Sequence, residues 1–240
     1  MTRLYFSGIF ADHGECRLDA AQAHHVQHVL RLAAGAQVIL FDGRGAEYPA
    51  TISRVDKSGI SLIAGERREV SRESPLAVTL AQGLSSGERM DYTIQKAVEL
   101  GVTAIQPLLT SRSVVRLAGE RAEKRAVHWR GVAIAACEQC GRNFIPEINN
   151  LRPITNWLGA PGGGLRLLLS PRAEVRLRDL PRPGGNVILL AGPEGGLSPE
   201  EEAAAQVAGF RLVKLGPRVL RTETAAVAAL AAMQTLWGDF

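Results

Sequence analysis

The alternation of apolar and polar residues changes its rhythm near residue 75. Beyond Pro75, short apolar runs bounded by glycine, proline and serine alternate with stretches in which apolar residues recur every three or four positions. The short runs predict strands and the periodic stretches predict helices. The predicted strands cover residues 75–84, 103–110, 165–170 and 186–192, and the predicted helices cover residues 88–101, 119–138, 198–209 and 223–237. This alternation is typical of an α/β domain with a parallel sheet flanked by helices, which binds ligands at the carboxyl ends of its strands.

The first 74 residues predict a β-rich unit built around one helix. Asp19 is a suitable N-cap for a helix over residues 20–32, in which Val26, Val29 and Leu30 recur at helical spacing. Three strand-like runs follow, separated by the turn sequences DGRG and DKSG. These runs cover residues 37–42, 46–55 and 59–68. We therefore expect a meander or a small barrel in this part of the chain.

The charge distribution also separates the two parts. The polar stretch at 67–75 predicts the boundary between a domain at 1–74 and a domain at 75–240. The first contains 9 basic and 9 acidic residues and the second 19 and 15, so the formal net charge of +4 lies entirely in the second. Arginine supplies 24 of the 28 basic residues, which suits contacts with phosphates and bases, although genomic base composition produces the same bias.

Cysteine spacing and hydropathy argue against a disulfide-stabilised, a zinc-binding or a membrane-spanning protein. Cys16 lies far from Cys137 and Cys140, so the three cysteines do not form a disulfide framework. The CxxC pair lacks a second ligand pair at zinc spacing, and we expect two ordinary thiols and no metal. The longest apolar run, Ala225 to Met233, has nine residues, whereas a membrane-spanning helix needs about 20. The opening residues are too weakly apolar for a signal peptide, so we expect a cytoplasmic protein without a membrane partner.

The strongest local signal is the sequence NVILLAGPEGGLSPEE at residues 186–201. An apolar strand leads into a glycine-rich turn, and Ser198, Pro199 and Glu201 then form a helix start with a capping box. Glycines let the backbone approach a ligand and offer amide donors beside the positive end of a helix. The spacing matches neither a phosphate-binding P-loop nor a dinucleotide fingerprint. A tight strand-to-helix turn without a ligand is the alternative interpretation.

Two further stretches combine polar groups at helix ends. In VKLGPRVLRTETAAVAAL, residues 213–230, Arg221 lies at the start of a predicted helix, where a cation opposes the helix dipole. An anionic or carbonyl partner would explain this arginine, and a solvated loop position is the alternative. In ACEQCGRNFIPEI, residues 136–148, Glu138, Gln139 and Arg142 gather where a helix should end at Gly141. Helix-end capping and a functional site explain this cluster equally well.

Taken in order, these stretches resemble one enzyme family. KAVELGV, EQCGRN, AGPEGGLSPEE and LGPRVLRTETA resemble motifs of the bacterial 16S ribosomal RNA uridine-N3 methyltransferases, which belong to the SPOUT superfamily. The N-terminal HHVQHVLRLAAGAQVILFDGRG is similar to the PUA-like RNA-binding module of that family. The resemblance covers nearly the whole chain, and the GPEGG and LR-TETA motifs are its most specific part. GPEGG also occurs in related SPOUT enzymes, so the cofactor is better supported than the target nucleotide.

The resemblance implies a fold, a cofactor and partners that composition and periodicity do not reveal. The second domain would be a trefoil-knotted α/β fold that binds S-adenosylmethionine, although knots are very rare among proteins. The first domain would be a PUA-like β-barrel. The family acts as a homodimer on a uridine of 16S ribosomal RNA, either naked or in the assembled small subunit. Its cofactor pocket lies at the knot and against the partner subunit.

The resemblance also implies roles for individual residues. Three loops at 168–172, 190–196 and 215–225 would hold the cofactor. Their predicted contacts are Leu169, Ser170, Leu190, Ala191, Gly192, Pro193, Glu194, Gly195, Gly196, Leu215, Gly216, Val219, Leu220, Arg221, Thr222, Glu223, Thr224 and Ala225. Arg221 is the candidate for stabilising a developing uracil anion, and Glu138 or Glu194 for accepting the N3 proton. The candidate RNA contacts are Arg3, Arg31, Arg89, Arg112, Gln139 and Arg142.

Two other functions remain open at this point. A SPOUT methyltransferase could act on another position, such as a ribose 2′-hydroxyl or a transfer RNA base. A non-catalytic RNA-binding protein could retain the β-rich module and a decayed cofactor site. The glycines at 192, 195 and 196 argue against decay, because a relaxed site tends to lose glycines that are conformationally costly.

Overall fold

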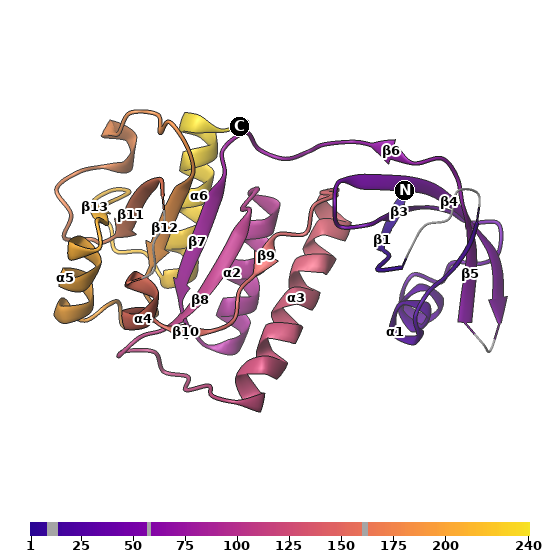
Figure 1. The fold of residues 1–240 in the computed structure, drawn as a ribbon, viewed down its shortest axis with the longest axis horizontal. Coiled ribbons are helices and arrows are strands. Elements are labelled where there is room, and N and C mark those ends of the chain that lie inside the picture. The colour runs from indigo at the N-terminus through magenta and orange to yellow at the C-terminus, as the bar shows by residue number, and fades with distance from the viewer. Residues whose placement is uncertain (9–13, 57–58, 160–162) are drawn as a thin grey trace. The chain divides into compact units, whose positions relative to one another are not determined.

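The computed structural model describes residues 1–8, 14–56, 59–159 and 163–240. The chain forms two compact units (Figure 1): Met1–Glu73 with Cys137–Ile145, and Ser74–Ala136 with Pro146–Phe240. The second unit therefore differs from the expected range of 75–240 mainly in lacking residues 137–145, which belong to the first. Two residues of the predicted DKSG turn, 57 and 58, lie outside the described residues. Within the described ranges, no helix has the length and hydropathy needed to cross a bilayer.

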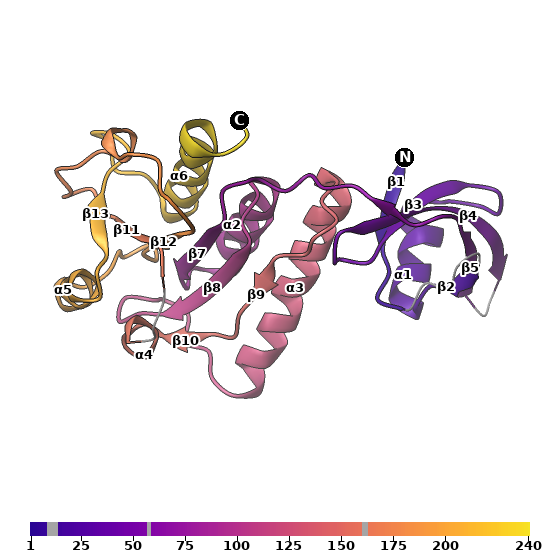
Figure 2. The same cartoon turned by 45° about the horizontal axis from the view of Figure 1, so that its top comes forward.

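The first unit is a six-stranded sheet wrapped around a short helix (Figure 2). Its elements are β1 (Thr2–Tyr5), β2 (Glu15–Arg17), α1 (Ala20–His24), a π-helical turn (His25–Val29), β3 (Gln37–Phe41), β4 (Ala46–Asp56), β5 (Gly59–Ala64) and β6 (Arg68–Glu69). The strand order is β1-β3-β4-β5-β2, and β6 also pairs with β4. β1 and β3 are parallel, and the other neighbours are antiparallel. The β-rich architecture predicted from the turn sequences is confirmed.

The helix of this unit follows its sequence signals only in part. The Asp19 carboxylate caps it by accepting the Gln22 N–H at 2.8 Å, as predicted. Val26 is fully buried in the core, whereas Val29, which recurs with it at helical spacing, is 63% exposed. The helix ends at Val29, and Arg31 adopts a left-handed φ of 53°. A π-helical turn winds more residues per turn than an α-helix, so the α-helical spacing does not hold across His25–Val29.

The second unit is an α/β domain with a seven-stranded parallel sheet. Its elements are β7 (Val78–Gly83), α2 (Gly87–Glu99), β8 (Ala104–Leu109), α3 (Glu120–Cys140, whose last residues belong to the first unit), β9 (Glu147–Ile148), β10 (Arg152–Pro153), α4 (Ile154–Leu158), β11 (Leu165–Leu169), a 3₁₀ turn (Leu177–Asp179), β12 (Val187–Ala191), α5 (Pro199–Val207), β13 (Arg211–Val213) and α6 (Thr222–Trp237). The strand order is β10-β8-β7-β12-β11-β13, with β9 also paired to β8. All these pairs are parallel. The predicted fold class is confirmed.

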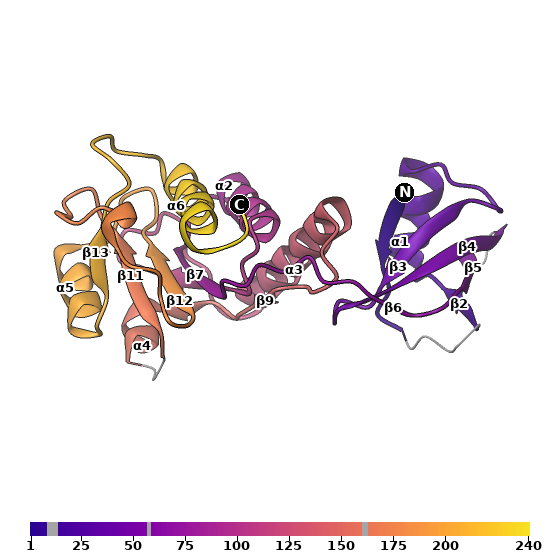
Figure 3. The ribbon, with the colours of Figure 1, turned by 90° about the horizontal axis from the view of Figure 1, so that it is seen from above.

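Helices cover both faces of this sheet (Figure 3). α4 and α5 pack together on one face over Leu108, Leu168 and Leu190, and α2 packs against α6 on the other. β12 lies between β7 and β11, so the chain returns from the edge strand β13 to the middle of the sheet before α6 begins. This order brings the carboxyl ends of β7, β11 and β12 together. The trefoil knot implied by the resemblance stays a prediction.

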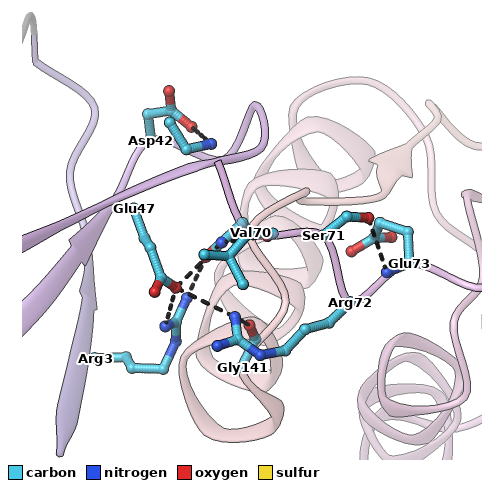
Figure 4. Close-up of polar contacts among 10 residues, drawn as sticks. Arg3, Asp42, Glu47, Val70, Ser71, Arg72, Glu73 and Gly141 are labelled. Atoms are coloured by element: carbon cyan, nitrogen blue, oxygen red, sulfur yellow. Dashed lines mark hydrogen bonds and ion pairs between the residues drawn. The ribbon is translucent and has the colours of Figure 1, made fainter. Parts of the chain in front are cut away.

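The EQCGRN motif completes the first unit. A single carboxylate oxygen, Glu47 Oε2, accepts hydrogen bonds from Arg3 Nη1 at 2.8 Å, Arg72 Nη1 at 3.2 Å and Asn143 Nδ2 at 3.2 Å (Figure 4). Asn143 also bonds Arg3 and donates to the Val70 carbonyl at 2.8 Å. These contacts join β1, β4, the stretch after β6 and the segment after α3 through side chains that are largely buried.

The neighbouring motif residues extend the same attachment. Arg142, whose side chain is 4% exposed, pairs with Glu73, and Glu138 accepts the backbone N–H of Tyr5 at 2.9 Å. The DGRG turn is held by the backbone as well: Gly45 N–H donates to Asn143 O at 3.1 Å and Ile145 N–H donates to Gly43 O at 3.2 Å. The EQCGRN motif therefore attaches the end of α3 and the segment after it to the β-rich unit.

Glu47→Ala should destabilise the first unit, because it leaves the buried groups of Arg3 and Asn143 without their acceptor. We expect a loss of about 3 kcal/mol in its free energy of unfolding. Hydrogen exchange of the amides in β1 and β4 measures this loss. Glu69→Ala removes a carboxylate of the exposed pair with Arg67 and is the matched control, with an expected change below about 0.5 kcal/mol. Equal effects of the two variants would contradict the central role of Glu47.

The Glu47 contribution also has a defined pH dependence. Burial alone would raise the pKa of Glu47, but hydrogen bonds from Arg3, Asn143 and Arg72 outweigh it and hold the pKa below its usual 4.5. A carboxyl with a lowered pKa stabilises the folded state above its unfolded value, and this stability is lost as the pH falls through the folded value. The wild-type unit should therefore lose more stability than Glu47→Ala as the pH is lowered from 6 to 3.

Candidate active site

A cleft of about 500 Å³ opens at the carboxyl ends of β11, β12 and β13. Three loops line it, at residues 168–172, 191–197 and 213–225, as the sequence predicted for the ligand-binding edge of the sheet. Of the eighteen predicted cofactor contacts, the cleft gathers all except two: Leu190, whose side chain is buried in the core beneath, and the exposed Thr224. The predicted cofactor contacts of these two residues stay predictions.

The glycine-rich loop after β12 has the geometry that its sequence indicated. Gly196 adopts a φ of +67° and its N–H bonds the Pro193 carbonyl at 2.9 Å, closing a tight turn. A β-carbon on Gly83, at the end of β7, would lie 2.6 Å from the Pro193 nitrogen, so only glycine allows the loop to approach the sheet this closely. The predicted capping box is confirmed: Glu201 N–H donates to Ser198 Oγ at 3.2 Å and Ser198 N–H donates to Glu201 Oε2 at 2.9 Å.

A buried amide fixes the loops to each other. Gln82, fully buried at the end of β7, donates from Nε2 to the Gly192 carbonyl at 3.2 Å and to Thr222 Oγ1 at 3.0 Å. The Thr222 hydroxyl in turn donates to the Gly192 carbonyl at 2.6 Å. The glycine-rich loop and the start of α6 are thereby tied to the middle of the sheet. Sequence analysis missed Gln82, although a glutamine inside an apolar strand pattern was a usable signal.

Two carboxylates lie on either side of Arg89 in the cleft. Arg89 Nη1 contacts Glu194 Oε1 at 3.1 Å and Arg89 Nε lies 3.9 Å from Glu223 Oε1. Burial would raise the pKa of Glu194, but the Ser86 backbone N–H and Arg89 lower it below its usual value, so the carboxylate is ionised at neutral pH. Within the described residues, the Oε2 atoms of Glu194 and Glu223 are buried and make no hydrogen bond. These acceptors are available to donors of a bound ligand.

Cations line the cleft beside these carboxylates. Arg112, Arg172, Lys214, Arg218 and Arg221 are on its walls. Arg172 pairs with Glu202, whereas the Arg221 guanidinium has no hydrogen bond or ion pair with any described residue. Arg221 is exposed and occupies the N-cap position of α6, at the helix start where the sequence placed it, so its charge is directed at neither a protein carboxylate nor a helix carboxyl end. The cleft can therefore place a free guanidinium next to a ligand.

The remaining predicted site residues lie in the first unit and do not line this cleft. Glu138 caps the Tyr5 amide, and burial raises its pKa, so it is a structural acceptor rather than a residue of the cleft. Arg3 and Arg142, which the sequence suggested as RNA contacts, are buried in ion pairs with Glu47 and Glu73. Arg31 and Gln139 are exposed. Arg89 and Arg112, also predicted as RNA contacts, line the cleft.

Within the described ranges, the thiols and the other ligand-type side chains form no metal site. The Cys137 thiol is buried and donates to the Phe144 carbonyl at 3.5 Å, and burial raises its pKa to about 12. Among the residues that the structure describes, no group of three or more histidine, cysteine, aspartate or glutamate side chains could hold a metal ion.

Sequence analysis missed eight of the residues that line the cleft. They are Leu168, Pro171, Arg172, Leu197, Glu202, Val213, Lys214 and Arg218. Leu168, Pro171, Arg172 and Arg218 lie inside the predicted loops but were not named as contacts. Leu197, Val213 and Lys214 flank the loops by one or two positions, so wider loop limits would have included them. Glu202 comes from α5, and no local sequence signal distinguishes it from its neighbours Glu200 and Glu201.

Comparisons with known proteins agree with this fold. An RNA methyltransferase domain matches residues 72–234, and an RNA methyltransferase PUA domain matches residues 18–64. These matches define an RNA methyltransferase with an N-terminal PUA domain.

Individual relatives identify the family more narrowly. The chain is 34% identical over 238 residues to the ribosomal RNA small subunit methyltransferase E of Buchnera aphidicola, covering 99% of this chain and 97% of the relative. It is 32% identical to the Bacillus subtilis enzyme of the same name, covering 88% and 86%. The Neisseria gonorrhoeae enzyme of that name, solved with bound S-adenosyl methionine, has a TM-score of 0.92 and 41% identity over 100% of this chain and 99% of that one. A Legionella pneumophila structure with bound SAM has a TM-score of 0.96, 41% identity and the same coverage. The chain belongs to the family of ribosomal RNA small subunit methyltransferases E, and the resemblance seen in the sequence is confirmed.

Thr222→Val should loosen the cleft, because it leaves Gln82 Nε2 and the Gly192 carbonyl with one partner fewer in a buried site. We expect the free energy of unfolding of the second unit to fall by about 2 kcal/mol, with faster hydrogen exchange at residues 192–196. Thr222→Ser keeps the hydroxyl and serves as the control. If valine and serine gave the same exchange rates, the hydroxyl would have no part in holding the loop.

Proposed function

We propose that the protein is an S-adenosylmethionine-dependent methyltransferase that methylates N3 of a uridine in the 16S ribosomal RNA of the small subunit. The observation that supports this most is the arrangement of the cleft, in which a free Arg221 guanidinium and the ionised Glu194 carboxylate lie beside a glycine-rich loop at the carboxyl end of the sheet. The family and the SAM-bound relatives support the cofactor and the ribosomal RNA substrate. The N3 position rests on the motif resemblance and the chemistry of these side chains.

The described residues fit the proposed cofactor. A cleft of about 500 Å³ falls within the usual range for small-ligand sites. The glycine-rich loop lets the backbone approach a ligand, and the buried Oε2 atoms of Glu194 and Glu223 lack the donors that an ammonium or hydroxyl groups of a ligand would supply. The loops at 168–172, 191–197 and 213–225 would hold it.

The proposed chemistry divides into alignment, charge stabilisation and proton removal. When bound, S-adenosylmethionine supplies a methyl group that its sulfonium already activates, so the protein mainly aligns donor and acceptor. Uridine N3 carries a proton and becomes a good nucleophile only when that proton leaves. Arg221 stabilises the negative charge that develops on a uracil carbonyl. Glu194, ionised and on the cleft wall, accepts the proton in preference to Glu138, which lies in the first unit.

The substrate is expected to bind mainly through phosphates. Arg89 and Arg112 line the cleft, and the exposed Arg31 and Gln139 offer contacts on the first unit. N3 is occupied in a Watson–Crick pair, so a paired target would have to be flipped out of the helix before reaction. We further propose that the enzyme acts in the cytoplasm as a homodimer, the assembly that the resemblance implies.

Calorimetry followed by modification mapping tests the proposed function. S-adenosylmethionine binding is measured first, and methyl transfer to small ribosomal subunits that lack the modification is then mapped by nucleoside. Binding with a new N3-methyluridine supports the proposal. Binding with methylation of a ribose 2′-hydroxyl or of another RNA would favour a different SPOUT target. Absence of cofactor binding would favour a non-catalytic RNA-binding protein.

Arg221→Ala should slow methyl transfer by about 10²–10³, because an electrostatic stabiliser of the developing anion is lost. Cofactor binding, measured by calorimetry, should stay within a few-fold of wild type. Arg221→Lys keeps the charge but loses the planar fork, so it should recover part of the rate. Near-normal turnover of the alanine variant would rule out this role.

Glu194→Gln should lower kcat by about 10², the usual scale for a lost general base. Glu138→Gln is the matched control, because it changes the same functional group in the first unit and keeps an acceptor for the Tyr5 amide. Single-turnover methyl transfer with saturating cofactor measures both variants. A larger loss in Glu138→Gln than in Glu194→Gln would reverse the assignment of the proton acceptor.

A further inference from the structure

The loop Thr110–Arg116, which follows β8, is closed by its own short side chains. Thr110 and Ser113 are buried, and their hydroxyl oxygens lie 3.0 Å apart. Thr110 N–H donates to Ser113 Oγ at 3.2 Å and Ser113 N–H donates to the Thr110 carbonyl at 3.2 Å. This reciprocal bonding gives the turn a fixed shape before any ligand binds.

Glu201 fastens this loop to the start of α5. Its carboxylate, on a residue that is 8% exposed, accepts the Ser111 backbone N–H at Oε1 over 2.7 Å and the Ser111 hydroxyl at Oε2 over 3.1 Å. The same Oε2 accepts the Ser198 N–H of the capping box. One buried carboxylate therefore joins two segments that are about 90 residues apart in the chain. Helix capping alone would need only the Ser198 contact.

This loop carries two arginines that form no ion pair with a described carboxylate, although Arg112 lies close enough to Glu200 to help lower the pKa of that carboxyl. Arg112 Nη1 donates to the Gly195 carbonyl at 3.1 Å, and Arg116 Nη2 donates to the Ser111 carbonyl at 3.0 Å. Both residues are exposed, and among the described residues neither forms an ion pair. Arg89 and Arg172, by contrast, contact carboxylates. A carbonyl orients a guanidinium without neutralising it, and leaves most of its five N–H donors available.

We propose that the loop Thr110–Arg116 is a preformed binding site for RNA phosphates beside the target nucleotide, with Glu201 as its positioning residue. This inference rests on the proposed function only in that the substrate is RNA. Arg112 lines the cleft, so phosphates bound here belong to nucleotides next to the one that enters it. Phosphate contacts set the register of a nucleic acid on a protein, and a fixed guanidinium sets it more accurately than a mobile one.

The variant Glu201→Gln separates positioning from charge. Glutamine supports a capping box, so α5 keeps its N-terminal contact. Its amide nitrogen, however, would meet the Ser111 N–H as a second donor, and the loop would lose its attachment. The substitution also removes a negative charge, which by itself would strengthen RNA binding. The proposal predicts the opposite result for Glu201→Gln. RNA binding should become about fivefold weaker, which corresponds to the loss of roughly one ionic contact.

Glu200→Gln is the matched control. Glu200 is an exposed neighbour in the first turn of α5, and its substitution makes the same charge change without removing a hydrogen bond to the loop. Its carboxylate interacts with Arg112 only through charge, so its loss would, if anything, strengthen phosphate binding there. The probe is the small ribosomal subunit lacking the modification, bound to filters across a series of KCl concentrations. We expect Glu200→Gln to bind as tightly as wild type or slightly more tightly. Similar shifts in both glutamine variants would overturn the positioning role of Glu201.

Substitution of the two arginines should change the salt dependence of RNA binding. Arg112→Gln and Arg116→Gln should each lower the slope of log K against log salt by about one, as expected for one lost phosphate contact. If the slope of log K against log salt were unchanged in these variants, the proposal would be overturned. The same holds if the variants altered only the dissociation of a dimer, because the loop would then be a protein contact.

Wild type that binds subunits with this salt dependence but forms no N3-methyluridine would contradict the proposed function alone. Normal N3 methylation with unaltered binding by the loop variants would contradict the loop proposal alone.

Discussion

The cleft of the α/β unit depends on the side chain of Gln82. Its amide nitrogen is shared between the Gly192 carbonyl and the Thr222 hydroxyl, deep in the fold where no water competes. Three segments from distant parts of the sequence meet at this point: the end of β7, the glycine-rich loop after β12, and the first residue of α6. A buried N–H group without acceptors is costly, so the contacts of Gln82 Nε2 favour the arrangement in which these three segments meet. The positions of Glu194, Glu223 and Arg221 on the cleft follow from it.

The same principle, a buried polar group with several partners, recurs at two other places. Glu47 joins four segments of the β-rich unit, and Glu201 joins the loop after β8 to α5. In each case the irregular segments are held together by hydrogen bonds to a carboxylate rather than by apolar packing. Loops offer few apolar side chains, and their backbone N–H groups need acceptors, which a carboxylate oxygen supplies with a strong, charge-assisted bond.

The sequence predicted the elements better than it predicted their partners. Period and turn residues were enough for the parallel sheet, for its flanking helices and for the ligand edge at GPEGG, because each of these signals is local. The functions of Arg3, Arg142 and Glu138 could not be predicted, because each depends on a partner between 69 and 140 positions away. An arginine bound to phosphate and an arginine bound to a buried carboxylate look the same in a sequence. The exposure of Val29 could not be predicted for a related reason, because a helical pattern in the sequence does not reveal a π-helical turn.

The fastening of the β-rich unit by residues 137–145 has a consequence for biosynthesis. Residues 1–73 leave the ribosome first, yet the side chains of Glu138, Arg142 and Asn143 that complete their hydrogen bonds follow only after α2, β8 and most of α3. Chains grow at about 5–20 residues per second, so the nascent N-terminal segment exists for several seconds without these partners. Arg3 and Glu47 can pair during that time, but the third member of their cluster is still missing. Although the first unit is synthesised first, its full set of hydrogen bonds can therefore form only after the middle of the α/β unit has been synthesised.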